Sequence, residues 1–277
     1  MGSPDFLVIG HVSRDRVEGG YRPGGTATYS ALTARSLGRR AAVITSASPD
    51  LNLDELFCDI EVLCVPSPVT TTFVNICEAD SRQQYIEAVA DKIPNGSVSP
   101  HWRSTPVVHL GPIANEFDED MIDLFPDSLL GLTPQGWLRQ WDGQGWVFPR
   151  PWRTARRFLH RIDALFVSEQ DLAGEATGLR SELHLPRMAV VTEGAEGATL
   201  HYQGHSTHIA PRETQAIDPT GAGDIFAAAF LVRLAETGHP HEAARFASVA
   251  ASLSVEQAGV ASIPDRAQIE SYLTSTP

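Results

Sequence analysis

A short glycine-bearing loop, Asp218-Pro219-Thr220-Gly221-Ala222-Gly223-Asp224, runs directly into the apolar stretch 225–231 and constrains this chain more than any other feature. The stretch contains no helix breaker and only alanine or larger apolar residues, so it predicts a buried helix. The two glycines let the backbone approach a ligand closely, and a helix start leaves several N–H groups without partners. These donors and the positive end of the helix dipole predict an anion site at Gly221, Ala222 and Gly223.

Asp224 falls in the first turn of the same predicted helix, beside the predicted anion site. An anion site stabilises the charge that develops on a phosphoryl group, and a neighbouring carboxylate can accept the proton of an attacking hydroxyl. The helix dipole favours the ionised form of this carboxylate. A capped helix start would also place an acidic residue here, but two glycines and two flanking carboxylates exceed what a cap needs. We therefore predict that Asp224 acts as a general base.

The charged residues exclude several classes of function. The chain has 21 basic and 34 acidic residues, a net charge of −13, which disfavours nucleic acid and anionic membranes as partners. Lys92 is the single lysine, and it lacks the glycine-rich loop and the following Ser or Thr of a P-loop. The apolar stretch 225–232 is too short to span a bilayer, and no leader pattern opens the sequence. We expect a cytoplasmic protein whose phosphate chemistry rests on backbone amides, a metal ion and arginine.

Short apolar runs alternate with helical stretches along most of the chain, which is typical of a parallel α/β fold. We therefore predict a three-layer α/β/α sandwich with a mostly parallel central sheet. The expected strands are 6–10, 41–44, 107–110, 129–132, 164–167 and 188–191, and the expected helices are 26–37, 152–160, 170–177, 221–236 and 241–256.

Two segments depart from this alternation. Segments 70–76 and 84–86 have the composition of strands and are separated by a polar turn at 78–82 with no helix, which predicts an antiparallel pair. The polar segment 11–25 contains the turn signals Gly19-Gly20 and Pro23-Gly24-Gly25. We predict one domain over residues 1–277, in which segments 11–25 and 70–89 form a small β-strand lid.

Taken together, these features resemble the ribokinase-like (PfkB) carbohydrate kinases. The loop from Asp218 to Asp224 matches the signature of that family, and the similarity extends across nearly the whole chain. Within the family, the sequence is most similar to the myo-inositol-kinase-like branch. The phrases that carry this similarity are Gly10-His11-Val12-Ser13-Arg14-Asp15, Gly24-Gly25-Thr26-Ala27-Thr28-Tyr29-Ser30, Asp218-Pro219-Thr220 and Ser254-Val255-Glu256-Gln257-Ala258-Gly259.

The resemblance assigns roles to matching positions. It implies Asp224 as the catalytic base and the three residues before it as the anion hole. Taken alone, Asp15 is more often a solvated loop residue and Gly24-Gly25 a turn. Thr192 and Gly194 alone indicate a strand-to-turn junction, and close helix packing is at least as consistent with Ser248. The resemblance implies contacts to substrate hydroxyls from Asp15, Gly24, Gly25 and Tyr29, and contacts to the nucleotide from Thr192, Gly194, Thr220 and Ser248.

Three positions differ from the family pattern or align loosely with it. Where the family has Asn-x-x-Glu, this chain has Ser168-Glu169-Gln170-Asp171, so Asp171 is either a water-mediated magnesium ligand or part of a helix cap. Tyr29 stands where the family usually has asparagine, so the contact to the acceptor must change. Arg139 aligns loosely with a family arginine that faces the phosphates, so it is a candidate phosphate ligand. The alternative is that Arg139 forms an ion pair on the surface.

The resemblance implies transfer of the γ-phosphoryl group of ATP, with Mg²⁺, to a hydroxyl of a small sugar or polyol, with an inositol among the candidates. The lid would exclude water during the transfer. Two rivals stay open: a nucleoside kinase in which Tyr29 and Phe73 stack on a base, and a non-catalytic polyol or nucleotide binder. The sequence also leaves open whether a monovalent cation is required and whether two copies form a homodimer through the lid.

Overall fold

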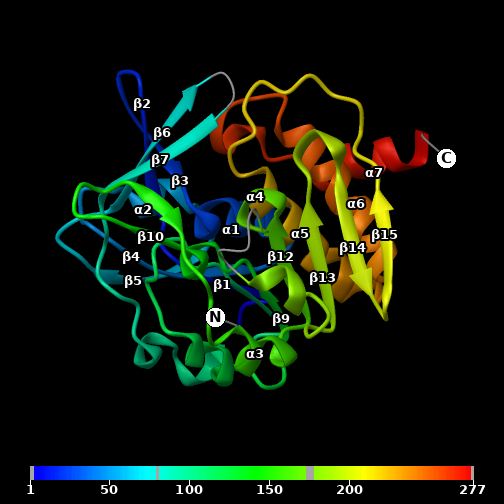
Figure 1. The fold of residues 1–277 in the computed structure, drawn as a ribbon, viewed down its shortest axis with the longest axis horizontal. Coiled ribbons are helices and arrows are strands. Elements are labelled where there is room, and N and C mark those ends of the chain that lie inside the picture. The colour runs from blue at the N-terminus through cyan, green and yellow to red at the C-terminus, as the bar shows by residue number, and fades with distance from the viewer. Residues whose placement is uncertain (1–2, 79–80, 173–177, 276–277) are drawn as a thin grey trace.

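The computed structural model describes residues 3–78, 81–172 and 178–275. A nine-stranded sheet lies at its centre (Figure 1). Its strands are β1 (Phe6–Ile9), β4 (Ala41–Ala47), β5 (Glu61–Pro66), β8 (Val107–Leu110), β9 (Leu129–Leu132), β12 (Ala164–Ser168), β13 (Met188–Thr192), β14 (Ala198–Tyr202) and β15 (His205–Ile209). The order is β15-β14-β13-β12-β9-β8-β1-β4-β5, and every pair from β13 to β5 is parallel. The pairs β13–β14 and β14–β15 are antiparallel.

The central strands bury both of their faces. In β1, Phe6 and Val8 belong to the core on one face of the sheet, and Leu7 and Ile9 belong to the core on the other. Such continuous apolar strands are typical of a parallel sheet that is covered on both sides. The predicted sandwich with a mostly parallel sheet is therefore confirmed.

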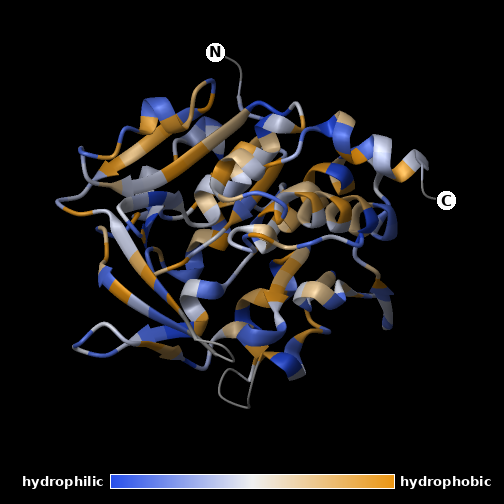
Figure 2. Ribbon diagram, turned by 90° about the horizontal axis from the view of Figure 1, so that it is seen from above, coloured by the Kyte–Doolittle hydropathy of each residue, from blue (hydrophilic) through white to orange (hydrophobic). Residues whose placement is uncertain are grey.

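The helices divide unequally between the two faces. Residues of four longer helices contribute to one core: α1 (Thr26–Ser36), α5 (Ala222–Thr237), α6 (Pro240–Ser254) and α7 (Arg266–Ser275). Figure 2 shows the apolar turns of the long helices grouped in the middle of the molecule. The other core is covered by short 3₁₀ helices and by α3 (Ala155–Phe158). Prolines at 112, 126, 134, 149 and 151 prevent longer helices along that part of the chain.

A separate four-stranded sheet forms the lid beside the main sheet (Figure 1). Its strands are β2 (Ser13–Val17), β3 (Gly20–Gly24), β6 (Thr71–Glu78) and β7 (Ser81–Ala88). They lie in the order β3-β2-β6-β7, with β2 and β6 parallel and the two outer pairs antiparallel. The predicted hairpin is thus present, and its expected turn at 78–82 includes residues 79–80, which lie outside the described residues.

Several elements differ from the sequence-based expectation. Strands β5, β14 and β15 and helix α7 were not predicted. The helix expected at 152–160 is divided into α3 and a 3₁₀ turn at Leu159–Arg161. Of the helix expected at 170–177, the described part is α4 (Glu169–Leu172), and 173–177 lie outside the described residues. Among the described residues, no helix combines the length and hydropathy that a membrane crossing requires.

A buried carboxylate ties the root of the lid to the main sheet. Glu116 is 1% exposed and accepts hydrogen bonds from the backbone N–H groups of His11 (2.8 Å), Ile113 (2.9 Å) and Ala114 (2.7 Å). The His11 ring hydrogen-bonds through Nδ1 to Thr71 Oγ1 at 2.7 Å. The start of β6 and the loop before β2 are therefore fixed to one point of the body.

We expect Glu116→Gln to lower the free energy of unfolding by about 2 kcal/mol, because one accepting oxygen becomes an NH₂ group that faces other donors. For a chain of this size, the corresponding fall in Tm is about 4 to 8 °C. Thermal unfolding of the two proteins measures it. The control is Glu61→Gln at an exposed position of β5, which should leave Tm unchanged. An equal Tm for Glu116→Gln and the natural chain would contradict this role.

Candidate active site

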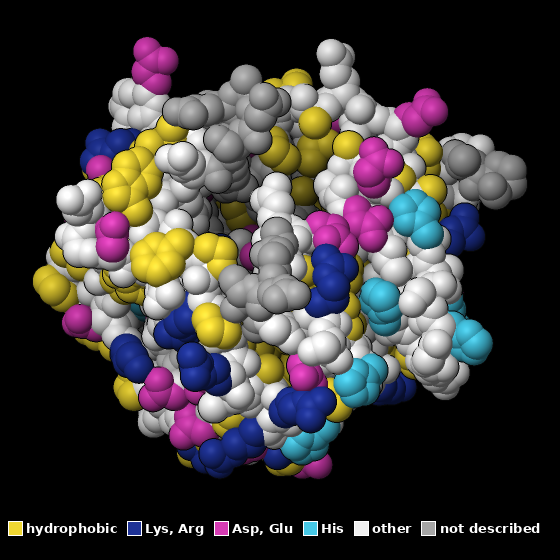
Figure 3. All heavy atoms as spheres, viewed as in Figure 1, with side chains coloured by type: hydrophobic (Ala, Val, Ile, Leu, Met, Phe, Trp, Pro, Cys, Tyr) yellow, Lys and Arg dark blue, Asp and Glu magenta, His cyan; other side chains and the backbone are white. Residues whose placement is uncertain are grey.

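A cavity of about 740 Å³ opens between the lid and the carboxyl ends of β9, β12 and β13. Figure 3 shows this face of the molecule hollowed beside the lid. The lid contributes Asp15, Phe73, Asn75 and Gln84 to the lining, and the body contributes the loop that precedes α5. Ligand sites in open α/β sheets lie at this end of the strands. The volume is in the range of small-molecule sites.

The loop before α5 carries free amides into this cavity. Gly221 is the N-cap of α5, with φ of 80° and ψ of −5°. The Ala222 amide donates to Pro219 O at 3.2 Å, so it is already used. Within the part of the chain that the structure describes, the amides of Gly221, Gly223 and Asp224 have no acceptor. The free donors of this loop are therefore the amides of Gly221, Gly223 and Asp224, whereas the sequence predicted those of Gly221, Ala222 and Gly223.

The two glycines of the loop are required for different reasons. A Cβ at Gly221 would stand 2.6 Å from the ring of Tyr29, and the positive φ also disfavours any other residue there. At Gly223, no protein atom lies within 4 Å of the place that a Cβ would take. The backbone of Gly223 therefore faces open space, as close approach of a ligand requires.

Asp224 lies in the first turn of α5, and its Oδ1 accepts a hydrogen bond of 2.6 Å from Thr26 Oγ1. Burial raises the pKa of this carboxyl from 3.8 to about 6, and the hydrogen bond from Thr26 is the largest opposing effect. The Arg139 guanidinium also lowers its pKa, whereas Asp171 and Asp15 raise it. We expected the helix dipole to favour ionisation, but the loss of solvation outweighs it. The carboxyl therefore has a pKa of about 6, so it is mostly ionised at neutral pH.

A raised carboxyl pKa makes a prediction about stability. Between about pH 3.8 and 6 the folded chain binds more protons at Asp224 than the unfolded chain, so this group's stability contribution falls as pH rises through that window. The gap corresponds to roughly 3 kcal/mol. We expect Asp224→Asn to raise Tm above that of the natural chain at about pH 8, and the difference to vanish near about pH 4.

Thermal unfolding across this pH range measures the effect. The control is Asp118→Asn, whose side chain is 72% exposed and paired with Lys92, and which should show no such gain at high pH. An Asp224→Asn protein that is no more stable than the natural chain at high pH would show that burial of the ionised carboxylate does not destabilise the fold.

Three of the four predicted acceptor-side residues line the cavity, and Gly24 does not. Asp15 reaches it from β2, and Gly25 reaches it as the N-cap of α1, with φ of 86°. A Cβ at Gly24 would stand 2.5 Å from Asp15 Oδ2 and 3.0 Å from Ser13 Oγ. Gly24 therefore makes room for the Asp15 carboxylate, and its contribution to the cavity is indirect.

Tyr29 lies between the acceptor side and the anion loop. Its side chain is 2% exposed, and its ring packs on Gly221. Burial, together with the carboxylates of Asp15, Asp218 and Asp224, raises the pKa of its phenol, so it stays protonated. Among the described residues its hydroxyl has no hydrogen-bond acceptor, so it remains a donor at the cavity wall.

Arg139 lines the cavity from the start of β10 (Arg139–Trp141), and it is part-buried rather than on the open surface. Its guanidinium donates to Gln84 Oε1 at 2.7 Å and lies 5.7 Å from the centre of the Phe73 ring. Gln84 Nε2 in turn donates to Asn75 Oδ1 at 3.0 Å. Sequence reasoning missed these two amides. The one feature of the sequence that could have indicated them is their polar character within predicted lid strands. Polar residues are also expected on the solvent-exposed face of such strands, so this feature does not identify a site.

The predicted nucleotide-side residues Thr192, Gly194, Thr220 and Ser248 all line the same cavity. The Ser248 hydroxyl donates to Ala210 O at 3.2 Å, so Ser248 also holds its helix against the neighbouring segment. The wall near Ser248 is completed by small and apolar side chains of the same region. These further lining residues are Ala251, Ser252 and Val255.

Asp171 lines the cavity and also caps its own helix. Its Oδ2 accepts from the Ser168 N–H at 2.9 Å and from the Ser168 hydroxyl at 2.7 Å, and its own N–H donates to Ser168 Oγ at 3.0 Å. This reciprocal arrangement is a capping box. Among the described residues, Oδ1 has no partner. Mg²⁺ keeps several waters and binds through one or two carboxylates together with substrate phosphates, so the single carboxylate of Asp171 fits it. Among the described residues, no cluster of three His, Cys, Asp or Glu side chains could hold a metal by itself.

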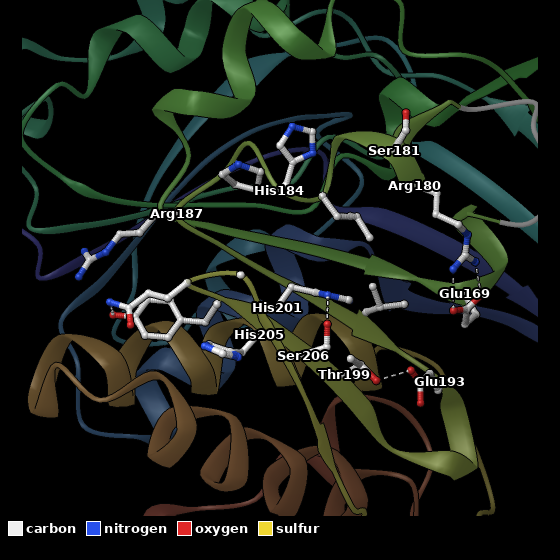
Figure 4. A pocket seen from close by; sticks show the side chains of 16 residues that line it. Glu169, Arg180, Ser181, His184, Arg187, Glu193, Thr199, His201, His205 and Ser206 are labelled. Carbon is white, nitrogen blue, oxygen red and sulfur yellow. Dashed lines mark hydrogen bonds and ion pairs between the residues drawn. The ribbon is translucent and has the colours of Figure 1, made fainter.

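A second groove, of about 890 Å³, lies over β13, β14 and β15 and is lined by exposed polar residues (Figure 4). Its cationic groups are already paired: Arg180 with Glu169 at 2.5 Å and Arg187 with Asp163 at 3.4 Å. It contains neither the anion loop nor Asp224. The candidate active site is therefore the cavity under the lid.

Part of the sequence matches known proteins. A model of the pfkB family carbohydrate kinases matches residues 155–266. The chain is 40% identical over 87 residues to a ribokinase of Arabidopsis thaliana, covering 30% of this chain and 23% of that protein. It is 38% identical over 71 residues to an inositol 3-kinase of Zea mays, covering 26% of this chain and 19% of that protein. The chain thus matches less than half of the length of these relatives.

The fold matches solved structures over nearly the whole chain. A pyrophosphate-dependent kinase of the ribokinase family, complexed with a pyrophosphate analogue and myo-inositol, has a TM-score of 0.79 and 24% identity, covering 96% of this chain and 99% of that one. An Arabidopsis thaliana ribokinase complexed with ribose and ATP has a TM-score of 0.75 and 22% identity, covering 98% and 99%. These likenesses establish the ribokinase-like fold.

The main sheet, its helices and the lid have the ribokinase-like α/β fold. Within that fold, residues 155–266 are similar to the pfkB family carbohydrate kinases.

Proposed function

We propose that this protein transfers the γ-phosphoryl group of ATP to a hydroxyl of a small sugar or polyol, with a cyclic polyol such as an inositol as the favoured acceptor. The observation that carries the proposal is the shared placement of the Asp224 carboxylate and the free amides of Gly221 and Gly223 in one cavity. A base and an anion site at the same point serve a reaction in which a hydroxyl attacks phosphorus.

The residues divide the reaction between them. Asp224 accepts the proton of the acceptor hydroxyl as its oxygen forms a bond to the γ-phosphorus. The bond from that phosphorus to the β,γ-bridging oxygen breaks, and ADP leaves with the bonding electrons. The amides of Gly221, Gly223 and Asp224 stabilise the negative charge on the transferred group, and the Arg139 guanidinium adds a cation on the same cavity wall. Asp15 and the Tyr29 hydroxyl orient the acceptor.

Asp171 would hold Mg²⁺ through a water, and the ion would neutralise charge on the donor phosphates. The lid of segments 11–25 and 70–89 would close over both substrates as part of one kinase domain. An ion pair of 3.4 Å between Arg22 of β3 and Asp218 of the anion loop links the lid to the loop, and this contact supports the proposed closure. Strand β3 is an edge of the lid sheet and carries the 48%-exposed Tyr21, so we include a homodimer joined through the lid in the proposal.

The rivals from the sequence receive less support. A nucleoside kinase would use Tyr29 and Phe73 to stack a base, but the Tyr29 ring packs on Gly221, and Phe73 is 3% exposed beneath the Arg139 guanidinium. A non-catalytic binder has no need of a buried carboxylate whose pKa lies near neutrality. Both observations favour a polyol kinase.

The donor is ATP in this proposal because the cavity continues past the anion loop. Besides Thr192 and Gly194, its lining includes the apolar side chains of Ala251 and Val255. A nucleoside would bury apolar surface against these side chains, whereas a pyrophosphate donor would leave this part of the cavity empty.

The test is phosphoryl transfer with Mg²⁺, either ATP or pyrophosphate, and a panel of inositols, acyclic polyols, ribose, fructose and nucleosides. We expect ADP release that depends on a polyol or sugar, with kcat/KM rising as pH increases through about 6 and then levelling, since the base must be ionised. Asp224→Asn should lower kcat by at least about 100-fold and leave acceptor binding, measured by calorimetry, largely intact.

Asp118→Asn is the matched control, because it removes one exposed carboxylate and should leave the rate unchanged. Turnover with nucleosides alone, or a near-natural rate for Asp224→Asn, would contradict the proposal. Turnover with pyrophosphate but not with ATP would show that the proposed donor is wrong, and it would leave the role of Asp224 as the base unchanged.

A further inference from the structure

Thr26 joins the start of α1 to the start of α5 at the reactive carboxyl. The two residues are 198 positions apart, and the Thr26 hydroxyl donates to Asp224 Oδ1 at 2.6 Å. Thr26 is 1% exposed, so water does not compete effectively for this hydrogen bond. The contact is short and buried, and it ends on an ionisable acceptor, which are the conditions under which a hydrogen bond is strong.

The rest of the Thr26 side chain is fixed by a glycine on another loop. A Cβ at Gly111, directly after β8, would overlap Thr26 Cγ2 and Cβ. Gly111 is itself packed against the loop after β1, because a Cβ at Gly10 would overlap Gly111 O. The methyl group of Thr26 thus occupies a space that exists because residue 111 has no side chain. Its rotamer, and with it the direction of its hydroxyl, is held by packing.

We propose that Thr26 is a positioning residue that holds Asp224 Oδ1 and leaves Oδ2 as the oxygen that receives the acceptor's proton, with Gly111 as the support that keeps Thr26 in place. The inference deepens the function proposed above and rests on it. A free carboxyl on a short side chain rotates about its last bond, whereas one anchored oxygen fixes the plane of the group. Fixed geometry of this kind contributes to rate through orientation.

Other charged and titratable groups act on the same carboxyl and must stay unchanged in a test. They come from four elements of the lid and body: Asp15 of β2, Tyr29 of α1, Arg139 of β10 and Asp171 of α4. Thr26 is uncharged and contacts Asp224 directly through its hydroxyl. Replacing Thr26 therefore alters the direct contact and keeps the surrounding charges.

The test compares Thr26→Val, which keeps the shape of the side chain and removes the donor, with Thr26→Ser, which keeps the donor and removes the methyl group. For Thr26→Val we expect kcat to fall by about 10-fold to 100-fold with acceptor KM little changed. The acid limb of kcat/KM should move to higher pH, because the hydrogen bond from Thr26 lowers the pKa of Asp224. Thr26→Ser keeps the donor but loses the methyl group that fixes the rotamer, so we expect a smaller fall in kcat than in Thr26→Val and a nearly natural acid limb.

Gly111→Ala provides a second variant that removes no polar group and does not line the cavity. We expect it to displace Thr26 and to shift the acid limb in the same direction as Thr26→Val. Unchanged kcat and an unchanged acid limb in Thr26→Val would overturn the proposal, as would equal losses in the valine and serine variants.

A titration that needs no turnover separates this inference from the proposed function. The side-chain carboxyl of Asp224 is followed by ¹³C NMR of aspartate-labelled protein, and its signal is assigned by its loss in Asp224→Asn. We expect the pKa to be higher in Thr26→Val than in the natural chain and nearly natural in Thr26→Ser. Such a shift in a chain without kinase activity would refute the function and support the contact, whereas equal pKa values in all three proteins would refute the contact.

Discussion

The site depends on a carboxylate that is buried beside backbone donors at the start of a helix. Removing Asp224 from water raises its pKa towards neutrality, and one hydrogen bond and one nearby arginine limit that rise. The amides beside it lack partners among the described residues, because the first turn of a helix cannot provide them. Both groups are costly in a folded chain without ligand, and in the proposed reaction both act on the phosphoryl group and the hydroxyl that enter the cavity.

The surrounding fold keeps these costly groups in place. Tyr29 supports Gly221 from α1, Thr26 holds Asp224 from the same helix, and glycines at 10 and 111 allow the close packing behind Thr26. The lid is fixed at its root by Glu116 and reaches the cavity through Asp15 and the Asn75–Gln84–Arg139 series of hydrogen bonds. The cavity is therefore shared by segments that are distant in sequence.

The sequence predicted those parts of the molecule that local patterns determine. Apolar runs such as 107–110 and 129–132 coincide with β8 and β9, because buried parallel strands are continuous in hydropathy. Polar strands such as β14 and β15 have one exposed face and no comparable run, so they were missed. The loop before α5 could be identified from its glycines.

The contacts of Thr26, Gln84 and Glu116 could not be predicted in the same way. Each depends on a partner far along the chain, and a single sequence carries no record of such pairs. The raised pKa of Asp224 likewise follows from burial, which is a property of the whole fold, whereas the helix dipole that we considered from sequence is a local effect.

The most direct measurement is a crystal structure of the protein with a polyol acceptor, Mg²⁺ and a non-hydrolysable ATP analogue. The account predicts one acceptor hydroxyl within about 2.6 to 3.2 Å of Asp224 Oδ2, and terminal phosphate oxygens on the amides of Gly221 and Gly223. An acceptor whose hydroxyls all point away from Asp224, or phosphates bound elsewhere in the cavity, would contradict it.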